Sequence, residues 1–369
     1  MLARRWKTDE VDYRDMARYR GDMPKIARTI ERSVFYLFRK DPKTAAITGP
    51  HGTGVLIARE SGQLAGELHY YAVTNKHVAC ALGASIIRLN TADGGTRFID
   101  LGPEDWEFLP EGDDIAAADL DYRLRPGHDQ VTHNNEDGFV SKAAIDGFEI
   151  GPGEDVFMCG LFSSHHGGDR NVPSVRFGNL SVLANDAAPI ELETGARLPS
   201  HVVDMRSRSG YSGSPVFVYR VPSSDLTTIP EDWNMAQRGE GIFQIGRRND
   251  HFLGFLGLHC GQFWDPVEVR VRRQKKRAER AGDPIKEGDR LLIQSGMTIV
   301  APAWRITDLL NLEVFEMARK KRDDEREEQW LRRPRAESVE PDTDTDANPD
   351  HLQDFKRLVD IAAKKKEKD

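Results

Sequence analysis

The sequence has few cysteines and no long apolar run, and both absences limit what the protein can be. Its three cysteines, Cys80, Cys159 and Cys260, lie far apart and form no CxxC pair, which argues against a disulfide framework and a structural zinc site. No stretch approaches the ~18–20 uncharged apolar residues that a membrane-spanning helix needs. The basic N-terminus is not followed by the apolar segment of a secretory signal peptide. We therefore expect a cytoplasmic globular protein with no membrane partner.

The sequence also has no large excess of acidic over basic residues. The 369 residues include 52 basic and 60 acidic side chains, which gives a net charge of −8. This balance does not favour nucleic acid or an anionic membrane as a partner. Basic residues are concentrated at 270–280, without interleaved aromatic side chains. We expect a solvated surface insertion there rather than a nucleic-acid site.

Short β-rich runs, separated by Gly, Pro, Asp and Asn, occupy most of the chain. Almost no long amphipathic helix lies between them, so the helical crossovers of an α/β fold are absent. Many short strands with turn residues between them predict an all-β barrel or sandwich. The runs are residues 34–38, 54–57, 70–74, 85–89, 156–158, 175–177, 215–219, 252–256 and 297–300.

Segments of other composition flank and interrupt this β-rich core. An apolar stripe between Trp304 and Phe315 predicts a helix at its end, and the charge-dense sequence beyond predicts a largely disordered tail with a short terminal helix. The arm and the tail are candidates for binding a regulatory protein partner. The predicted divisions are a helical N-terminal arm at 1–32, a core at 33–315 with surface insertions near 221–249 and 265–290, and a tail at 316–369.

Three motifs in a fixed order contain residue types that cooperate in acyl transfer. TNKHVA contains His77, GDDIA contains Asp113 and Asp114, and GYSGSP contains Ser212 in a tight turn before a strand. A serine hydroxyl needs an adjacent base to take its proton, and imidazole titrates near neutrality. A carboxylate can orient the imidazole and balance its developing charge. The glycines of the turn allow the amides of Gly210 and Ser212 to stabilise an oxyanion.

In the order and residue content of these motifs, the sequence resembles the chymotrypsin-like (trypsin-like) serine peptidases, in particular their disulfide-free bacterial and viral-type branch. The resemblance covers roughly residues 33–310. It implies two six-stranded antiparallel β-barrels with the active site in the cleft between them, and it implies no metal and no organic cofactor. At the matching positions it implies His77 as general base, Asp114 as the residue that orients it and Ser212 as nucleophile. The expected activity is hydrolysis of peptide bonds in a protein or peptide substrate through an acyl-enzyme.

The sequence departs from the family pattern at three positions. Tyr211 stands where secreted members have an aspartate that pairs with a newly cleaved N-terminus, so we do not expect activation by N-terminal insertion. Ser214 stands where a second glycine is usual, and a small side chain is tolerable there. Asp113 competes with Asp114 for the catalytic role. The carboxylate directly before Ile115 matches the family pattern better, which favours Asp114.

A specificity hypothesis and two non-enzymatic alternatives stay open. The run LGLHCG resembles a strand of viral 3C-like and glutamate-specific peptidases, which implies that His259 contacts Glu or Gln before the cleaved bond; a hydrogen-bonded core histidine is the alternative. A latent or non-catalytic adaptor would bind a protein or nucleic-acid partner through the basic insertion or the tail. A nucleic-acid-associated regulator would use residues 270–280. The complete set of three catalytic residue types disfavours the adaptor, because a scaffold has no chemical need for all of them.

Overall fold

The computed structural model describes residues 26–125, 127–129, 132–192, 195–220, 252–268 and 289–332. The chain divides into one unit at residues 1–321 and a second at 322–369, and all of the described strands belong to the first. Most of the predicted arm, the basic run and the predicted terminal helix lie outside the described residues. Within the described part, no helix has both the length and the apolar character to cross a bilayer.

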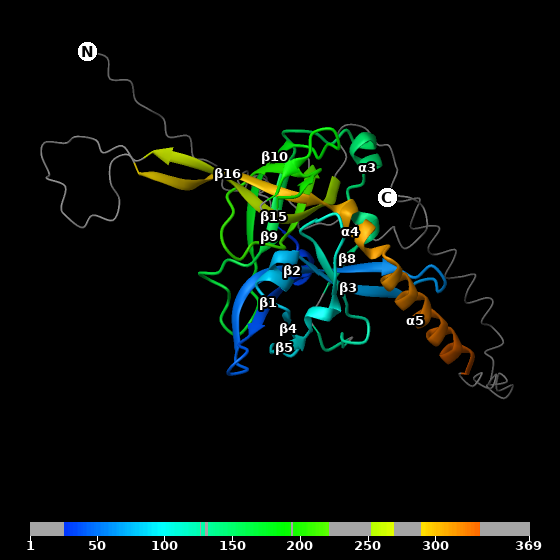
Figure 1. The fold of residues 1–369 in the computed structure, drawn as a ribbon. Helices are drawn as coiled ribbons and strands as arrows, with labels where there is room; N and C mark the ends of the chain where they lie inside the picture. The colour runs from blue at the N-terminus through cyan, green and yellow to red at the C-terminus, as the bar shows by residue number, and fades with distance from the viewer. Residues whose placement is uncertain are drawn as a thin grey trace, which may run out of the picture. The chain divides into compact units, whose positions relative to one another are not determined.

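The first half of the chain forms an eight-stranded sheet (Figure 1). Its strands pair in the order β5-β4-β1-β2-β3-β7-β6, with β8 parallel to β2. The resemblance implies a closed six-stranded barrel here, whereas the described strands form an open path that ends at β5 and β6. The strands are β1 (Val34–Lys40), β2 (Ile47–Glu60), β3 (Leu68–Thr74), β4 (Ile86–Asn90), β5 (Thr96–Asp100), β6 (Trp106–Glu107), β7 (Ala116–Asp119) and β8 (Asn134–Asn135).

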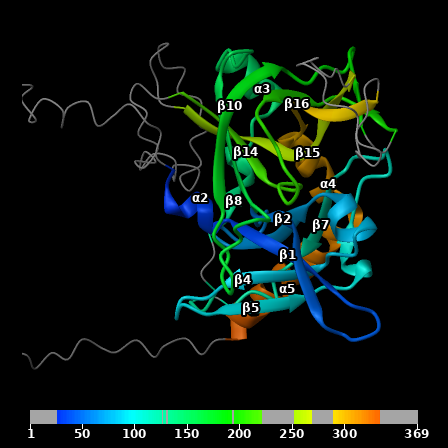
Figure 2. The same ribbon diagram turned by 90° about the vertical axis from the view of Figure 1, so that its left-hand side faces the viewer.

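The second half forms a closed antiparallel barrel in the order β10-β13-β16-β15-β14-β9. The all-β fold class with a six-stranded antiparallel barrel is thereby confirmed. In Figures 1 and 2 the barrel and the first sheet occupy separate regions of the ribbon. The barrel strands are β9 (Asp155–Gly160), β10 (Ser174–Val182), β13 (His201–Asp204), β14 (Pro215–Arg220), β15 (Phe252–Glu268) and β16 (Arg290–Pro302), and β11 (Ile190–Glu191) pairs separately with β12 (Arg197–Leu198).

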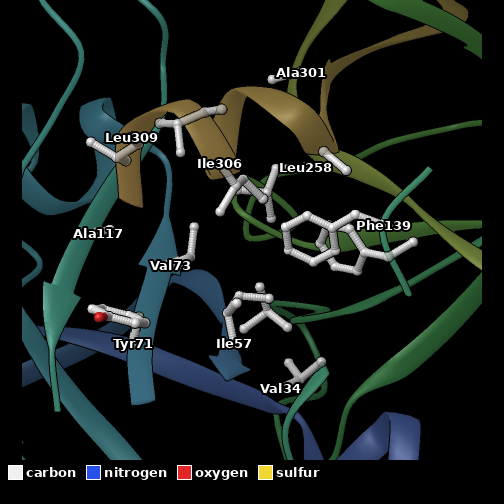
Figure 3. Close-up of a cluster of buried hydrophobic side chains, with 14 of the residues drawn as sticks. Val34, Ile57, Tyr71, Val73, Ala117, Phe139, Leu258, Ala301, Ile306 and Leu309 are labelled. Carbon is white, nitrogen blue, oxygen red and sulfur yellow. The ribbon is translucent and has the colours of Figure 1, made fainter. Parts of the chain in front are cut away.

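Strand β1 shows why the apolar runs are continuous rather than alternating. Val34 and Tyr36 belong to one buried cluster, whereas Phe35 and Leu37 belong to another. Successive side chains of a strand point to opposite faces of the sheet, so both faces of β1 are buried. The first of these clusters also includes residues of the barrel, such as Leu258 (Figure 3). This shared core holds the sheet and the barrel together by apolar packing.

The predicted helix near residue 304 is present, but it is two helices. In α4 (Ala303–Leu310) the apolar stripe is buried, with Ile306 and Leu309 fully inaccessible. A second helix, α5 (Glu313–Arg332), extends well past residue 316, where the sequence predicts a disordered tail. Its charged residues come as a basic run at 319–322 followed by a mostly acidic run at 323–328, and most of its residues are exposed or partly exposed. The other helices are α2 (Arg28–Arg32), η1 (His77–Ala81), η2 (Pro103–Asp105), η3 (Glu136–Gly138) and α3 (Lys142–Gly147).

The predicted insertion near 265–290 begins and ends as regular structure. Strands β15 and β16 continue beyond the barrel as a two-stranded ribbon (Figure 1), with Trp264 opposite Gln294 and Glu268 opposite Arg290. The sequence pattern at 265–268 is too polar to predict a strand, and pairing with β16 supplies the backbone hydrogen bonds that extend it.

Candidate active site

His77 and Asp114 are brought together by the pairing of β3 with β7. Thr74, the last residue of β3, lies opposite Ala116, the first residue of β7. His77 follows the end of β3 and Asp114 precedes the start of β7, so both lie at the same edge of the sheet. Their side chains are in contact, with His77 Nδ1 2.5 Å from Asp114 Oδ2.

Two further hydrogen bonds hold Asp114 in this position. The backbone N–H of His77 donates to Asp114 Oδ1 at 2.8 Å, and Asn75 Nδ2 donates to the Asp114 carbonyl at 2.8 Å. The Asp114 side chain is 6% exposed, whereas that of His77 is 34% exposed. Because an ionised carboxylate only accepts hydrogen bonds, His77 Nδ1 carries the proton and Nε2 can accept one.

Asp113 is turned away from His77 and paired with an arginine of α4. Arg305 Nε donates to Asp113 Oδ1 at 3.1 Å, and Arg305 Nη2 donates to Asp113 Oδ2 at 2.5 Å. The hydrogen bonds that Arg305 donates to Asp113 raise the pKa of Arg305 against the opposing effect of its burial. Of the two carboxylates in the GDDIA motif, Asp114 is therefore the one that contacts the imidazole.

Ser212 lies in the turn that precedes β14, and this turn is bound to β2 of the first sheet. Thr53 N donates to the Ser212 carbonyl at 2.9 Å, and Thr53 Oγ1 donates to the Gly210 carbonyl at 2.7 Å. The next residue of β2, Gly54, pairs with Thr74 at the end of β3. The turn that carries Ser212 is thus attached beside the strand end that leads to His77. The hydrogen bonds of the described residues do not include one between the Ser212 hydroxyl and His77.

The backbone of this turn requires glycine at Gly213. Its φ of +83° lies in the left-handed region, and a Cβ there would be 2.1 Å from the Thr53 carbonyl oxygen and 2.5 Å from Thr74 Oγ1. A side chain at this position would therefore push the turn away from β2.

The amides of the turn differ in whether they are already bonded. Those of Tyr211, Gly213 and Ser214 donate to carbonyls of Arg208, His259 and Tyr211, at 3.3, 3.0 and 2.9 Å. Within the described residues the amides of Gly210 and Ser212 have no acceptor. Two unbonded donors from alternate residues of one turn are suited to bind an anionic oxygen.

Tyr211 attaches the turn to the barrel. Its side chain is 1% exposed, its hydroxyl is hydrogen-bonded to Ser174 Oγ on β10, and the guanidinium of Arg176 lies 4.9 Å from the ring centroid. A buried aromatic ring with a satisfied hydroxyl and a cation on its face is a stable anchor. The residue directly before Ser212 is therefore an aromatic anchor between the turn and the barrel.

His259 lies on β15 next to the same turn, with its backbone hydrogen-bonded to Gly213 and Ser214. The side chain is buried, and neither ring nitrogen has a partner among the described residues. Burial lowers the pKa of His259 to about 4. The ring is therefore neutral at pH 7.

The sequence motifs contain the proposed catalytic groups but only some of the residues that hold them. Asn75 lies within TNKHVA, and the spacing of the motifs does not reveal its hydrogen bond to Asp114. Thr53 lies outside the three motifs. Arg305 lies in a helix far from the motifs, where nothing in the local sequence indicates a contact with Asp113.

Comparisons with known proteins add little to this geometry. No protein-family model matches the chain, and no curated protein matches it either. Among solved structures, the chain is similar to the active form of the Rv3671c protease from M. tuberculosis, with 15% identity over 84% of this chain and 92% of that one and a TM-score of 0.35. It is also similar to Deg5, with 13% identity over 59% of this chain and 90% of that one and a TM-score of 0.33. At these scores the likenesses carry no argument about fold or activity, and the site rests on its own contacts.

Proposed function

We propose that the protein is a serine endopeptidase with His77, Asp114 and Ser212 as its catalytic triad. The observation that carries the proposal is the buried Asp114 carboxylate bonded to His77, beside a turn that attaches Ser212 to the adjacent strand. A carboxylate, an imidazole and a serine in this relation are what nucleophilic acyl transfer needs.

In this mechanism Ser212 Oγ attacks the carbonyl carbon of the scissile bond while His77 Nε2 takes the hydroxyl proton. The oxyanion of the tetrahedral intermediate accepts hydrogen bonds from the amides of Gly210 and Ser212. His77 then gives its proton to the leaving amine, and the acyl group remains as an ester on Ser212. Water, deprotonated by His77, hydrolyses the ester, releases the carboxylic acid and restores the serine. Asp114 stabilises the imidazolium at both steps.

His259 supports a preference for a carboxamide side chain before the cleaved bond. Its imidazole is neutral at pH 7, and a neutral ring has one donor and one acceptor, which match the acceptor and donor of a Gln side chain. A buried Glu carboxylate would find no positive charge on this ring. We therefore expect Gln to be favoured over Glu within the Glu or Gln preference that the sequence suggests.

Cleavage of a diverse peptide library, read by mass spectrometry, tests the activity. The native chain is expected to cleave peptides, and S212A is expected to lose cleavage to the level of the blank. Ser209 is an exposed serine of the same turn, and S209A, the matched control, is expected to cleave like the native chain. A native chain that cleaves nothing, or an S212A variant that cleaves equally, would contradict the proposal.

The same library tests the specificity. We expect Gln, and more weakly Glu, to be enriched before the cleaved bond, and H259V to lose the enrichment while still cleaving. Enrichment of basic or large apolar residues at that position would overturn the specificity hypothesis but would not contradict the proposed triad. The adaptor and nucleic-acid alternatives depend on segments that lie outside the described residues.

A further inference from the structure

Two consecutive buried carboxylates of the site are held by different elements. The side chain of Asp113 is 3% exposed and that of Asp114 is 6% exposed. An ionised carboxylate at this depth needs a cation or several hydrogen bonds to remain charged. Asp114 has His77 as its partner, and Asp113 has Arg305, which is 192 residues away in the sequence. The segment between β6 and β7 is therefore tied to α4, the helix that follows the barrel.

The Arg305 guanidinium is itself firmly placed. Besides the two-pronged contact with Asp113, Arg305 Nη1 contacts Asp308 Oδ2 at 2.7 Å within the same helix. That helix is embedded in the core through Ile306 and Leu309. A planar guanidinium that bonds a carboxylate with two nitrogens restricts the direction as well as the distance of its partner.

We propose that Arg305 is a positioning residue for the peptidase reaction: by holding Asp113, it fixes the backbone from which Asp114 reaches His77. This inference rests on the proposed function. Asp114 has two other attachments, the Asn75 side chain on its carbonyl and the His77 amide on its carboxylate. Both come from the side of His77. Arg305 supplies a further attachment one residue earlier, on Asp113, and this attachment comes from α4 rather than from the segment of His77.

Arg305 also keeps the charges of the two carboxylates compatible. Two negative charges buried next to each other repel. The guanidinium balances Asp113, which leaves the negative charge of Asp114 available to the imidazolium. Without Arg305, a buried and unpaired carboxylate would lie next to the catalytic one.

Steady-state kinetics on a cleaved library peptide test the proposal. R305M is expected to lower kcat by roughly 10- to 100-fold with KM within about twofold of native. R305K is expected to restore part of kcat, because lysine keeps the charge but not the two-pronged contact. The matched control is R59M, since Arg59 also holds α4, through the Leu310 carbonyl at 3.2 Å, but does not contact Asp113. R59M is expected to keep the native kcat below its unfolding temperature.

If R305M alone does not fold, the double variant D113N/R305M tests the proposal in its place. It removes both charges and leaves no unpaired buried ion, so it is expected to fold and to show a kcat between those of R305M and the native chain. A double variant with native kcat, or an R305M variant with the kcat of R59M, would overturn the proposal.

The low-field ¹H NMR signal of the proton between His77 Nδ1 and Asp114 reports on the position of Asp114 and requires no substrate turnover. It is assigned by its absence in H77A, and it is expected in the native chain and in R59M but shifted or lost in R305M. If the native chain cleaves no peptide while the signal behaves in this way, the proposed function fails and the positioning role stands. If the native chain cleaves and R305M leaves both the signal and kcat unchanged, the positioning role alone fails.

Discussion

At the scale of single residues, Thr53 makes hydrogen bonds to three separate parts of the molecule in addition to its place in β2. Its amide and hydroxyl donate to the carbonyls of Ser212 and Gly210, its hydroxyl accepts from Leu161 N at 2.9 Å, and its carbonyl accepts from Thr74 Oγ1 at 2.6 Å. One buried residue therefore connects the first sheet, the barrel and the turn of the proposed nucleophile.

Replacing Thr53 with valine keeps the shape and removes the hydroxyl. The Gly210 carbonyl and the Leu161 amide would then be buried without this partner, so we expect a loss of about 1–3 kcal/mol in the free energy of unfolding. Because the Gly210 amide belongs to the proposed oxyanion site, we also expect kcat to fall about 10-fold or more. Urea unfolding and peptide cleavage measure the two effects.

T53S is the matched control, because it keeps the hydroxyl and removes only a methyl group. It is expected to retain most of the native kcat. A T53V variant that is as active as T53S would show that the hydroxyl does not hold the turn in its active geometry.

At the scale of elements, the junction of α4 and α5 is held by arginines from two directions. The Leu310 carbonyl, at the end of α4, accepts from Arg59 of β2 at 3.2 Å and from Arg319 of α5 at 2.9 Å. Arg319 also donates to the hydroxyl of the buried Tyr71 at 3.0 Å. Cations near a helix C-terminus stabilise its unbonded carbonyls.

We expect R319M to lower the free energy of unfolding by about 1–2 kcal/mol, because it leaves the Tyr71 hydroxyl without this donor. Lys320 is the exposed neighbour on the same helix, and K320M is expected to change stability by less than about 0.5 kcal/mol. Urea unfolding of both variants makes the comparison. Equal effects would mean that the contacts of Arg319 do not stabilise the junction.

The elements also show where sequence reasoning succeeds and where it stops. Strand β1 and helix α4 are predictable, because buried apolar side chains give each a clear pattern. Beyond Gln262 the apolar residues of the ribbon of β15 and β16, such as Leu292 and Ile293, are exposed and mark no buried face, and α5 beyond residue 316 has few apolar positions. The regular structure of the ribbon comes from the pairing of its two strands.

At the scale of the whole molecule, two buried neutral histidines make the fold sensitive to acid. Burial lowers the pKa of His201 to about 3 and that of His259 to about 4. In the unfolded chain both groups have the ordinary value of 6.5. Below pH 6.5 the unfolded state therefore binds protons that the native state does not, and stability falls with pH until the native pKa values are reached.

Between pH 7 and pH 5, where most carboxyl groups do not yet titrate, each of these histidines should reduce the free energy of unfolding by about 2 kcal/mol. Urea unfolding at several pH values measures the loss. In H201N the asparagine oxygen can still accept the hydrogen bond that Ala184 N now donates to His201 Nδ1. We expect H201N to remove about half of the loss, and a pH dependence equal to that of the native chain would contradict this account.

The residues proposed to react can be predicted from the sequence, whereas the residues that hold them in place cannot. His77, Asp114 and Ser212 lie in short motifs whose residue types are tied to one reaction, so local sequence is enough to select them. Their support comes from side chains that tertiary contacts bring from distant elements, such as Arg305 on Asp113. Such contacts depend on the packing of the whole chain, and the spacing of residues within a motif does not predict them.

The central claim is that Ser212 is a nucleophile activated by His77, and labelling with a fluorophosphonate tests it most directly. The reagent forms a covalent phosphonate ester with an activated serine and displaces fluoride. We predict that the native chain is labelled, that mass spectrometry locates the adduct on Ser212, and that S212A is not labelled. An unlabelled native chain, or equal labelling of S212A, would contradict the account.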